Sequence, residues 1–182
     1  IDAILEMAPD LVVGETTTPT LHADLDLIGA LKSAGFKGKT ALAGTHITVL
    51  YEETLNSCPE LDFALVGEYD RSVPELAASL EKSADIPGVA GRVNGKVNFP
   101  GRRPVIEDLD TLPFVSAVYK KFLNIEDYFY ALARHPMIQI LSSRGCPFQC
   151  SFCQYPQTMG GRKYRVRSPE NFVKELEYIQ NV

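Results

Sequence analysis

Three of the four cysteines in this chain lie within one eight-residue stretch near its C-terminal end. They are Cys146, Cys150 and Cys153, so their spacing is C-x3-C-x2-C. Chance would give this spacing in well under ~1% of chains with so few cysteines, so we infer that the thiols act together, as metal ligands. Three thiolates fill three positions of a four-position site, whereas an electron-transfer [4Fe–4S] cluster normally takes four cysteines. The spacing therefore predicts a metal centre with one open position.

The residues alone leave two alternative kinds of metal site. His135 would complete a zinc site of three cysteines and one histidine. Cys58, which stands 88 residues before Cys146, would complete an ordinary four-cysteine cluster. Neither residue has motif-like spacing to the three clustered cysteines.

An aromatic residue, Phe152, stands directly before the last of these cysteines. This C-x3-C-x-aromatic-C pattern resembles the cluster loop of radical S-adenosylmethionine (SAM) enzymes. The resemblance implies that Cys146, Cys150 and Cys153 hold a [4Fe–4S] cluster whose open iron binds SAM, with Phe152 on the adenine side. It further implies cleavage of SAM by one electron to a 5′-deoxyadenosyl radical, a small-molecule substrate, and a reductant protein such as flavodoxin or ferredoxin. No residue of this chain is assigned a catalytic role.

The elements before this loop alternate between strands and helices. Short apolar strands are predicted at 11–14, 40–43 and 62–66, and helices at 21–34, 50–56 and 72–82. This alternation predicts a parallel sheet with helices on both faces, and in such sheets ligands bind outside the carboxyl ends of the strands. Three loops are expected at that edge: Glu15–Thr18, Gly44–His46 and Gly67–Glu68.

The sequences around these strand ends carry a second resemblance. Pro9-Asp10-Leu11-Val12, Ala43-Gly44-Thr45-His46 and Val66-Gly67-Glu68 together resemble the cobalamin (B12)-binding domain that precedes the barrel in one class of radical SAM enzymes. The resemblance implies that Gly44, which has no Cβ, lets the backbone approach the nucleotide tail of the cofactor. The cobalamin contacts that it implies are Thr16, Thr17, Thr18, Gly44, Thr45, His46, Gly67 and Glu68. For His46, a turn hydrogen bond remains the alternative to a binding role.

The second half of the chain is expected to lead into a barrel. Arg92–Val97 predicts a hairpin with an Asn-Gly type I′ turn, and 104–113 a linker. An amphipathic helix is predicted at 124–134, a first barrel strand at 137–141, and a helix capped by Ser168 that runs to Val182. We therefore expect an α/β fold: a Rossmann- or flavodoxin-like B12-binding sheet without its first strand (1–90), a hairpin, linker and connecting helix (91–136), and the first βα unit of a TIM-like partial barrel (137–182).

Charge is distributed unevenly along the chain, whose net charge is −5. Residues 1–90 carry 15 acidic and 5 basic side chains, and residues 91–182 carry 8 and 13. The basic stretch at 162–167 is interpreted as a solvated loop or a contact to an anionic ligand, with no nucleic-acid partner predicted for a net acidic chain. The sequence contains no run of about 20 apolar residues, so no transmembrane segment is predicted. Clustered cysteines suit a reducing cytosol, so a cytoplasmic location is expected.

The function expected from these features is that of a cobalamin-dependent radical SAM enzyme. The chain is interpreted as an internal piece of a longer protein, inactive by itself. The run Cys153–Gly161 resembles members that act on hopanoid lipids or tetrapyrroles, so methyl transfer, cyclisation or ring rearrangement on such a molecule is expected. The alternative is a non-catalytic metal-binding module with a zinc site.

Overall fold

The computed structural model describes residues 1–180, which form two compact units. The first unit contains residues 1–105 and 146–162, and the second contains residues 106–145 and 163–182. The predicted end of the last helix at Val182 lies outside the described residues. The domain boundaries expected from the sequence remain a prediction.

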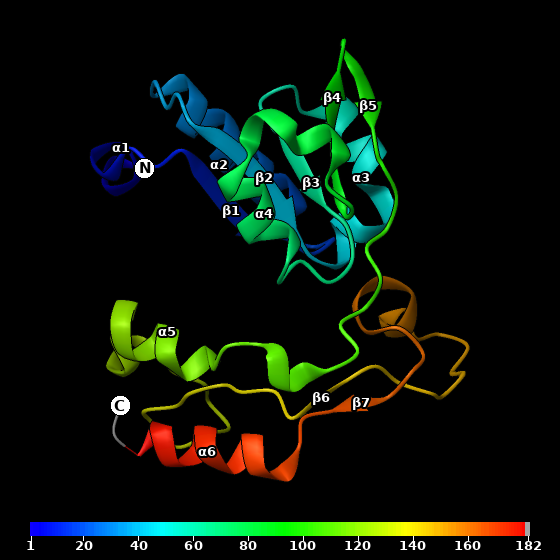
Figure 1. The fold of residues 1–182 in the computed structure, drawn as a ribbon. Coiled ribbons are helices and arrows are strands. Elements are labelled where there is room, and N and C mark those ends of the chain that lie inside the picture. The colour runs from blue at the N-terminus through cyan, green and yellow to red at the C-terminus, as the bar shows by residue number, and fades with distance from the viewer. Residues whose placement is uncertain (181–182) are drawn as a thin grey trace. The chain divides into compact units, whose positions relative to one another are not determined.

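A five-stranded mixed sheet forms the centre of the first unit (Figure 1). The strands follow the order β1 (Leu11–Glu15), β2 (Lys39–Ala43), β3 (Phe63–Leu65), β4 (Val89–Val93) and β5 (Lys96–Asn98). β1, β2 and β3 are parallel, as predicted, whereas β4 runs antiparallel to β3 and β5 antiparallel to β4. The hairpin, which the sequence predicted as a separate element after the parallel strands, thus extends the sheet by two antiparallel strands.

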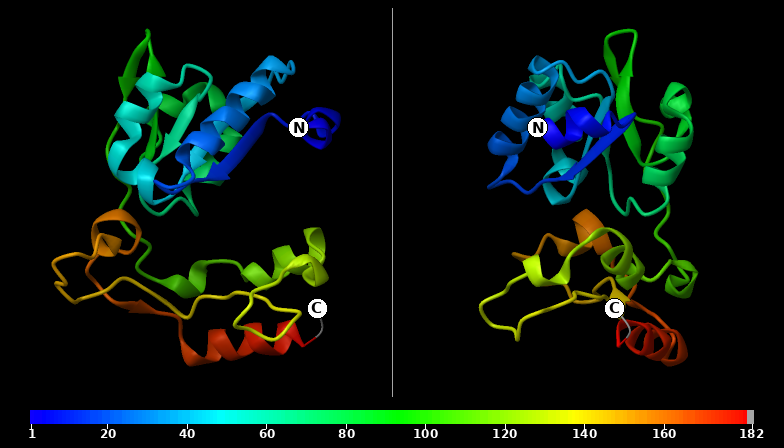
Figure 2. Two further views of the ribbon diagram at one scale, coloured as in Figure 1. Left: turned by 180° about the vertical axis from the view of Figure 1, so that it is seen from behind. Right: turned by 90° about the vertical axis from the view of Figure 1, so that its left-hand side faces the viewer.

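Helices cover both faces of this sheet, as Figure 2 shows. α2 (Leu21–Ser33) and α3 (Thr45–Ser57) pack on one face, where the core includes Ile28, Leu42, Ile47, Leu55 and Ala64. α4 (Ser72–Ala78) and the 3₁₀ turn η1 (Leu80–Asp85) pack on the other face around Ala41, Ala43, Phe63, Leu65 and Leu76. The alternation of buried residues along β2 and β3 between the two cores is that of strands buried on both sides.

Local sequence explains where several elements begin and end. α1 (Asp2–Met7) stops just before Pro9. α2 ends at Ser33, and Gly35 two residues later has a φ of 98°, which turns the chain away from the helix. The turn between β4 and β5 has φ of 51° at Asn94 and 78° at Gly95, as the predicted type I′ turn requires.

Two predicted helices have different bounds in the structure. α3 begins at Thr45 instead of near Leu50, and Leu50 marks a kink inside it. The predicted helix at 72–82 is α4 alone, and the 3₁₀ turn η1 follows it. Gly44 with φ of 109° precedes the first turn of α3, so His46 lies in a helix and not in a turn.

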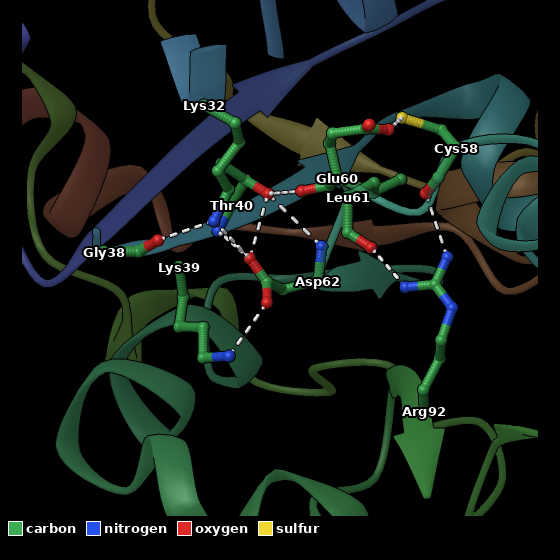
Figure 3. Close-up of polar contacts among 9 residues, drawn as sticks. All are labelled: Lys32, Gly38, Lys39, Thr40, Cys58, Glu60, Leu61, Asp62 and Arg92. Atoms are coloured by element: carbon green, nitrogen blue, oxygen red, sulfur yellow. Dashed lines mark hydrogen bonds and ion pairs between the residues drawn. The ribbon is translucent and has the colours of Figure 1, made fainter. Parts of the chain in front are cut away.

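A network around Asp62 joins α2 to the sheet (Figure 3). The Asp62 carboxylate accepts hydrogen bonds from Lys32 Nζ at 3.0 Å, Lys39 Nζ at 2.9 Å and the Thr40 amide at 3.0 Å. Burial acts to raise the pKa of Asp62, but the hydrogen bonds from Lys39, Lys32 and Thr40 outweigh it and leave that pKa below its usual value. The ionised carboxylate therefore stabilises the fold.

Arg92 of β4 binds the last carbonyls of α3 and the loop that follows (Figure 3). Its guanidinium donates to the carbonyls of Leu61 at 2.7 Å and Cys58 at 2.9 Å, and to that of Leu55. A cation at a helix C-terminus satisfies carbonyls that have no partner in the helix and opposes the negative end of its dipole. Arg92 thus fixes the C-terminal end of α3 to the sheet.

In the described part of the chain, the second unit contains two helices and a two-stranded ladder. Its elements are the 3₁₀ turns η2 (Leu109–Thr111) and η3 (Ile125–Asp127), the helices α5 (Val115–Phe122) and α6 (Pro169–Ile179), and the strands β6 (Ser143–Arg144) and β7 (Arg165–Val166). Ser168 caps α6 by accepting a hydrogen bond from the Asn171 amide at 3.1 Å, with Pro169 in the first turn, as predicted.

The predictions for residues 124–141 were wrong. The segment 124–134 forms only the 3₁₀ turn η3, and Phe129 and Leu132 of its apolar stripe are exposed. The segment 137–141 is not a strand; the two-residue β6 follows it and pairs antiparallel with β7. Apolar periodicity marks residues that need burial, but a helix or strand forms only where a partner surface buries them.

A buried ion pair holds α6 in the second unit. Glu175, with no exposed surface, accepts from Arg167 and, at 2.9 Å, from the hydroxyl of Ser116 on α5. Although burial favours the neutral acid, these donors keep the pKa of Glu175 below its usual value. The guanidinium of Arg167 also lies over the rings of Phe114 and Phe172, with 5.4 Å to each centroid.

Candidate metal and cofactor site

The cysteine loop is closed at its base by backbone hydrogen bonds. The Cys146 amide donates to the Gly161 carbonyl at 3.1 Å, so the two ends of the segment 146–161 lie side by side. Within it, the Cys153 amide donates to the Cys150 carbonyl at 3.2 Å. All three cysteines are free thiols; Cys150 is exposed, and the other two are half-buried. Three unpaired thiols on one loop fit the donor set of an iron–sulfur cluster.

Positive charge and an aromatic ring lie on the same loop. Arg162 donates to the carbonyl of Phe148, between the first two cysteines, at 2.9 Å. The ring of Phe152 is 91% exposed and contacts no core, so the structure leaves its predicted place beside the adenine of SAM untested. After Cys153 the chain forms the π-helical turn η4 (Pro156–Gly160), which lies against α3.

Among residues 1–180, no three His, Cys, Asp or Glu side chains are gathered closely enough to hold a metal ion, and this includes the three cysteines. The two alternative ligands are engaged elsewhere. The ring of His135 bonds to the Glu126 carbonyl at 2.9 Å. Cys58 is buried in the core of the first unit with its Sγ 3.6 Å from a Glu60 carboxylate oxygen, and burial raises the pKa of its thiol.

Hydrogen bonds join the three predicted loops at the carboxyl ends of β1, β2 and β3, which we call the carboxyl edge. The Thr16 amide donates to the Ala43 carbonyl at 2.9 Å, and Thr18 Oγ1 lies 3.1 Å from His46 Nδ1. A Cβ on Gly44 would lie 2.2 Å from the Thr16 carbonyl oxygen, so only glycine permits this approach. The structure therefore brings the 15–18 and 44–46 loops together, as predicted from topology.

Thr48 links the third loop to this edge and was not singled out by the sequence analysis. Its buried hydroxyl donates to the Gly44 carbonyl at 2.9 Å and accepts from the Gly67 amide at 3.0 Å. Threonine one turn into a helix is common, so no sequence signal marked this position. A Cβ on Gly67 would meet no atom within 4 Å, and Glu68 beside it is buried.

The other predicted contacts differ in exposure. Thr16 is buried, whereas Thr17 and Thr18 are exposed at the surface of their loop, and Thr45 is half-buried. His46 is buried and also lines a cavity of about 680 Å³ between α2 and α3. Its Nδ1 bonds to Thr18 of the 15–18 loop, which is not the local turn hydrogen bond of the alternative, and its binding role remains a prediction.

The basic stretch at 162–167 is occupied by contacts within the chain. Lys163 pairs with Glu107, Arg165 donates to the Ile106 carbonyl at 2.5 Å, and Arg167 pairs with Glu175. These three basic side chains thus make contacts within the second unit. None of the helices described between residues 1 and 180 has the length and apolar composition that a membrane-spanning helix needs.

The comparisons with known proteins agree with both the cysteine loop and the sheet described above. A family model described as the radical SAM superfamily matches residues 140–182. An uncharacterized methyltransferase of Pyrococcus horikoshii is 28% identical over 179 residues, covering 97% of this chain and 38% of the relative. Anaerobic magnesium-protoporphyrin IX monomethyl ester cyclase of Rubrivivax gelatinosus is 29% identical over 185 residues, covering 98% of this chain and 32% of the relative. The chain thus spans about a third of the length of these relatives.

A solved structure shares the fold over nearly the whole chain. It is the radical SAM methyltransferase TsrM from Kitasatospora setae with cobalamin and a [4Fe–4S] cluster bound. The TM-score is 0.68 at 17% identity, covering 99% of this chain and 37% of TsrM. The segment that carries the cysteine spacing thus matches the radical SAM superfamily of enzymes over residues 140–182, and the likeness in fold extends over nearly the whole chain.

Proposed function

We propose that the full-length protein is a cobalamin-dependent radical SAM enzyme that transfers a methyl group to, or closes or rearranges a ring on, a lipid, tetrapyrrole or similar natural product. The observation that carries the proposal is the loop of three free cysteines within the segment that matches the superfamily. The methyltransferase and the tetrapyrrole cyclase among the relatives support the two reaction types.

In this proposal Cys146, Cys150 and Cys153 hold a [4Fe–4S] cluster and leave one iron for SAM. A bound cluster of this kind supplies one electron to cleave SAM, and a bound cobalamin supplies a methyl carrier or a redox partner. The bond between the Cys146 amide and the Gly161 carbonyl fixes the base of the loop. Arg162, whose guanidinium bonds to the Phe148 carbonyl, holds the loop backbone between the first two cysteines.

The carboxyl edge is the proposed cobalamin site. Gly67, where a Cβ would meet no atom within 4 Å, leaves room for a ligand beside the backbone, and Gly44 lets the 15–18 loop approach this edge. Thr17, Thr18 and Thr45 supply hydroxyl groups. Loops at this edge of a parallel sheet are the usual position for a cofactor. We further propose that a flavodoxin or ferredoxin in the cytoplasm reduces the cluster.

Anaerobic iron–sulfur reconstitution of the full-length protein tests the cluster. We expect about four irons and four sulfides per chain, as a [4Fe–4S] cluster requires, and an electron paramagnetic resonance (EPR) spectrum that changes on addition of SAM. The triple variant C146A/C150A/C153A should lose at least about nine-tenths of the iron, because it lacks all three ligands. Cys58→Ala is the matched control and should retain it. Zinc without sulfide in the wild-type protein would overturn the proposal in favour of a zinc module.

A further inference from the structure

Arg102 joins the cysteine loop to α3 in the first unit. It lies in the segment that follows β5, and its Nη1 donates to the Gln157 carbonyl at 3.1 Å. Its Nη2 donates to the Thr48 carbonyl at 3.2 Å. A single guanidinium thus bonds to two backbone segments that are more than a hundred residues apart in the sequence.

At one end, Arg102 bonds to a compact turn that begins directly after the third cysteine. The Gln157 and Thr158 amides both donate to the Gln154 carbonyl, at 3.0 and 3.1 Å. The Thr158 hydroxyl lies 3.1 Å from the same carbonyl, and its side chain is buried. Because Gln154 follows Cys153, a displacement of this turn also moves the third cysteine.

At the other end, Arg102 bonds to the helix that carries the carboxyl edge. Thr48 itself bonds to Gly44 and Gly67, and it precedes the kink at Leu50 by two residues. Side chains that bond to carbonyls often accompany a helix kink, because the regular i→i−4 ladder is interrupted there. Arg102 therefore bonds at one end to the segment that follows the cysteines and at the other end to the helix beside the proposed cobalamin edge.

We propose that Arg102 is a positioning residue that holds the segment after Cys153 against α3 and so sets the place of the third cysteine relative to the carboxyl edge. The functional meaning of these two sites rests on the proposed function. Arginine suits this role because its planar fork donates to two carbonyls at once, whereas lysine presents a single point donor.

Hydrogen–deuterium exchange of the full-length protein tests this role. Arg102→Gln should speed amide exchange of residues 154–161 about fivefold, because the turn loses its bonds to α3. Arg102→Lys should give an intermediate rate. Arg103→Gln is the matched control, because Arg103 bonds instead to Ser72 and Glu75 of α4. It should leave exchange of 154–161 within about twofold of the wild type.

A second measurement tests whether the position of this turn affects the binding of SAM to the cluster. In the reconstituted Arg102→Gln protein, iron content should be unchanged because the three cysteines remain, while the SAM concentration for half of the EPR change should rise about fivefold. Wild-type exchange rates in Arg102→Gln, or equal acceleration in Arg103→Gln, would overturn the positioning role. Failure of the wild-type protein to build a cluster would overturn the proposed function instead, and the exchange comparison would still decide the role of Arg102.

Discussion

Asp62 shows how one half-buried carboxylate makes stability depend on pH. Its pKa is lower in the folded protein than the value of about 3.9 expected for an unfolded chain, so the folded state binds fewer protons near that pH. Its stabilising contribution is therefore complete above about pH 4 and is lost as pH falls through the folded pKa.

We accordingly predict that Asp62→Asn lowers the free energy of unfolding by about 2 kcal/mol at pH 7, because charged hydrogen bonds to two lysines are lost. The difference from the wild type should shrink as the pH is lowered below about 4. Urea unfolding of the full-length protein at several pH values measures it. Glu6→Gln on the exposed side of α1 is the control, and a pH-independent difference for Asp62→Asn would contradict the prediction.

Two glycines show that the effect of a methyl group depends on the element that holds the residue. Gly44 has φ of 109°, and a Cβ there would meet the Thr16 carbonyl oxygen, whereas Gly29 lies within α2 with nothing within 4 Å of the corresponding Cβ. Alanine is favoured over glycine inside a helix, but it is strained at a positive φ.

We predict that Gly44→Ala weakens cobalamin binding by at least about tenfold, because the 15–18 loop must move away from the carboxyl edge. Gly29→Ala should leave cobalamin affinity unchanged and raise the free energy of unfolding by about 0.5–1 kcal/mol. Spectroscopic titration with cobalamin and urea unfolding of the full-length protein measure both effects. Normal cobalamin affinity in a folded Gly44→Ala protein would exclude this edge as the binding site.

At the scale of the whole molecule, the two proposed cofactor sites use separate ligands. Thr16 bonds to Ala43, and Thr48 bonds to Gly44 and Gly67; none of these bonds involves a cysteine of the 146–153 loop. We therefore predict that C146A/C150A/C153A binds cobalamin within about twofold of the wild-type affinity although it holds no cluster. Cobalamin titration of the iron-free variant measures this. A loss of binding beyond tenfold would show that the cluster is needed to form the cobalamin site.

The sequence could predict the features that depend on neighbouring residues. The three clustered cysteines lie within eight residues. The turn between β4 and β5 depends on the two residues Asn94 and Gly95, and the start of α6 depends on Ser168 and Pro169. The strands β1 to β3 were also predicted, because strands that are buried on both faces are continuously apolar.

Only the tertiary structure decided which distant residues meet. Arg102 and Thr48 carry no local signal, and their importance arises from backbone carbonyls that the fold brings within reach. The apolar stripe at 124–134 predicted a helix, but these residues form only a short 3₁₀ turn with exposed apolar side chains. Local propensity and periodicity are weak compared with the free energy of burial, so the chemistry of this chain is encoded locally and its arrangement is set by packing.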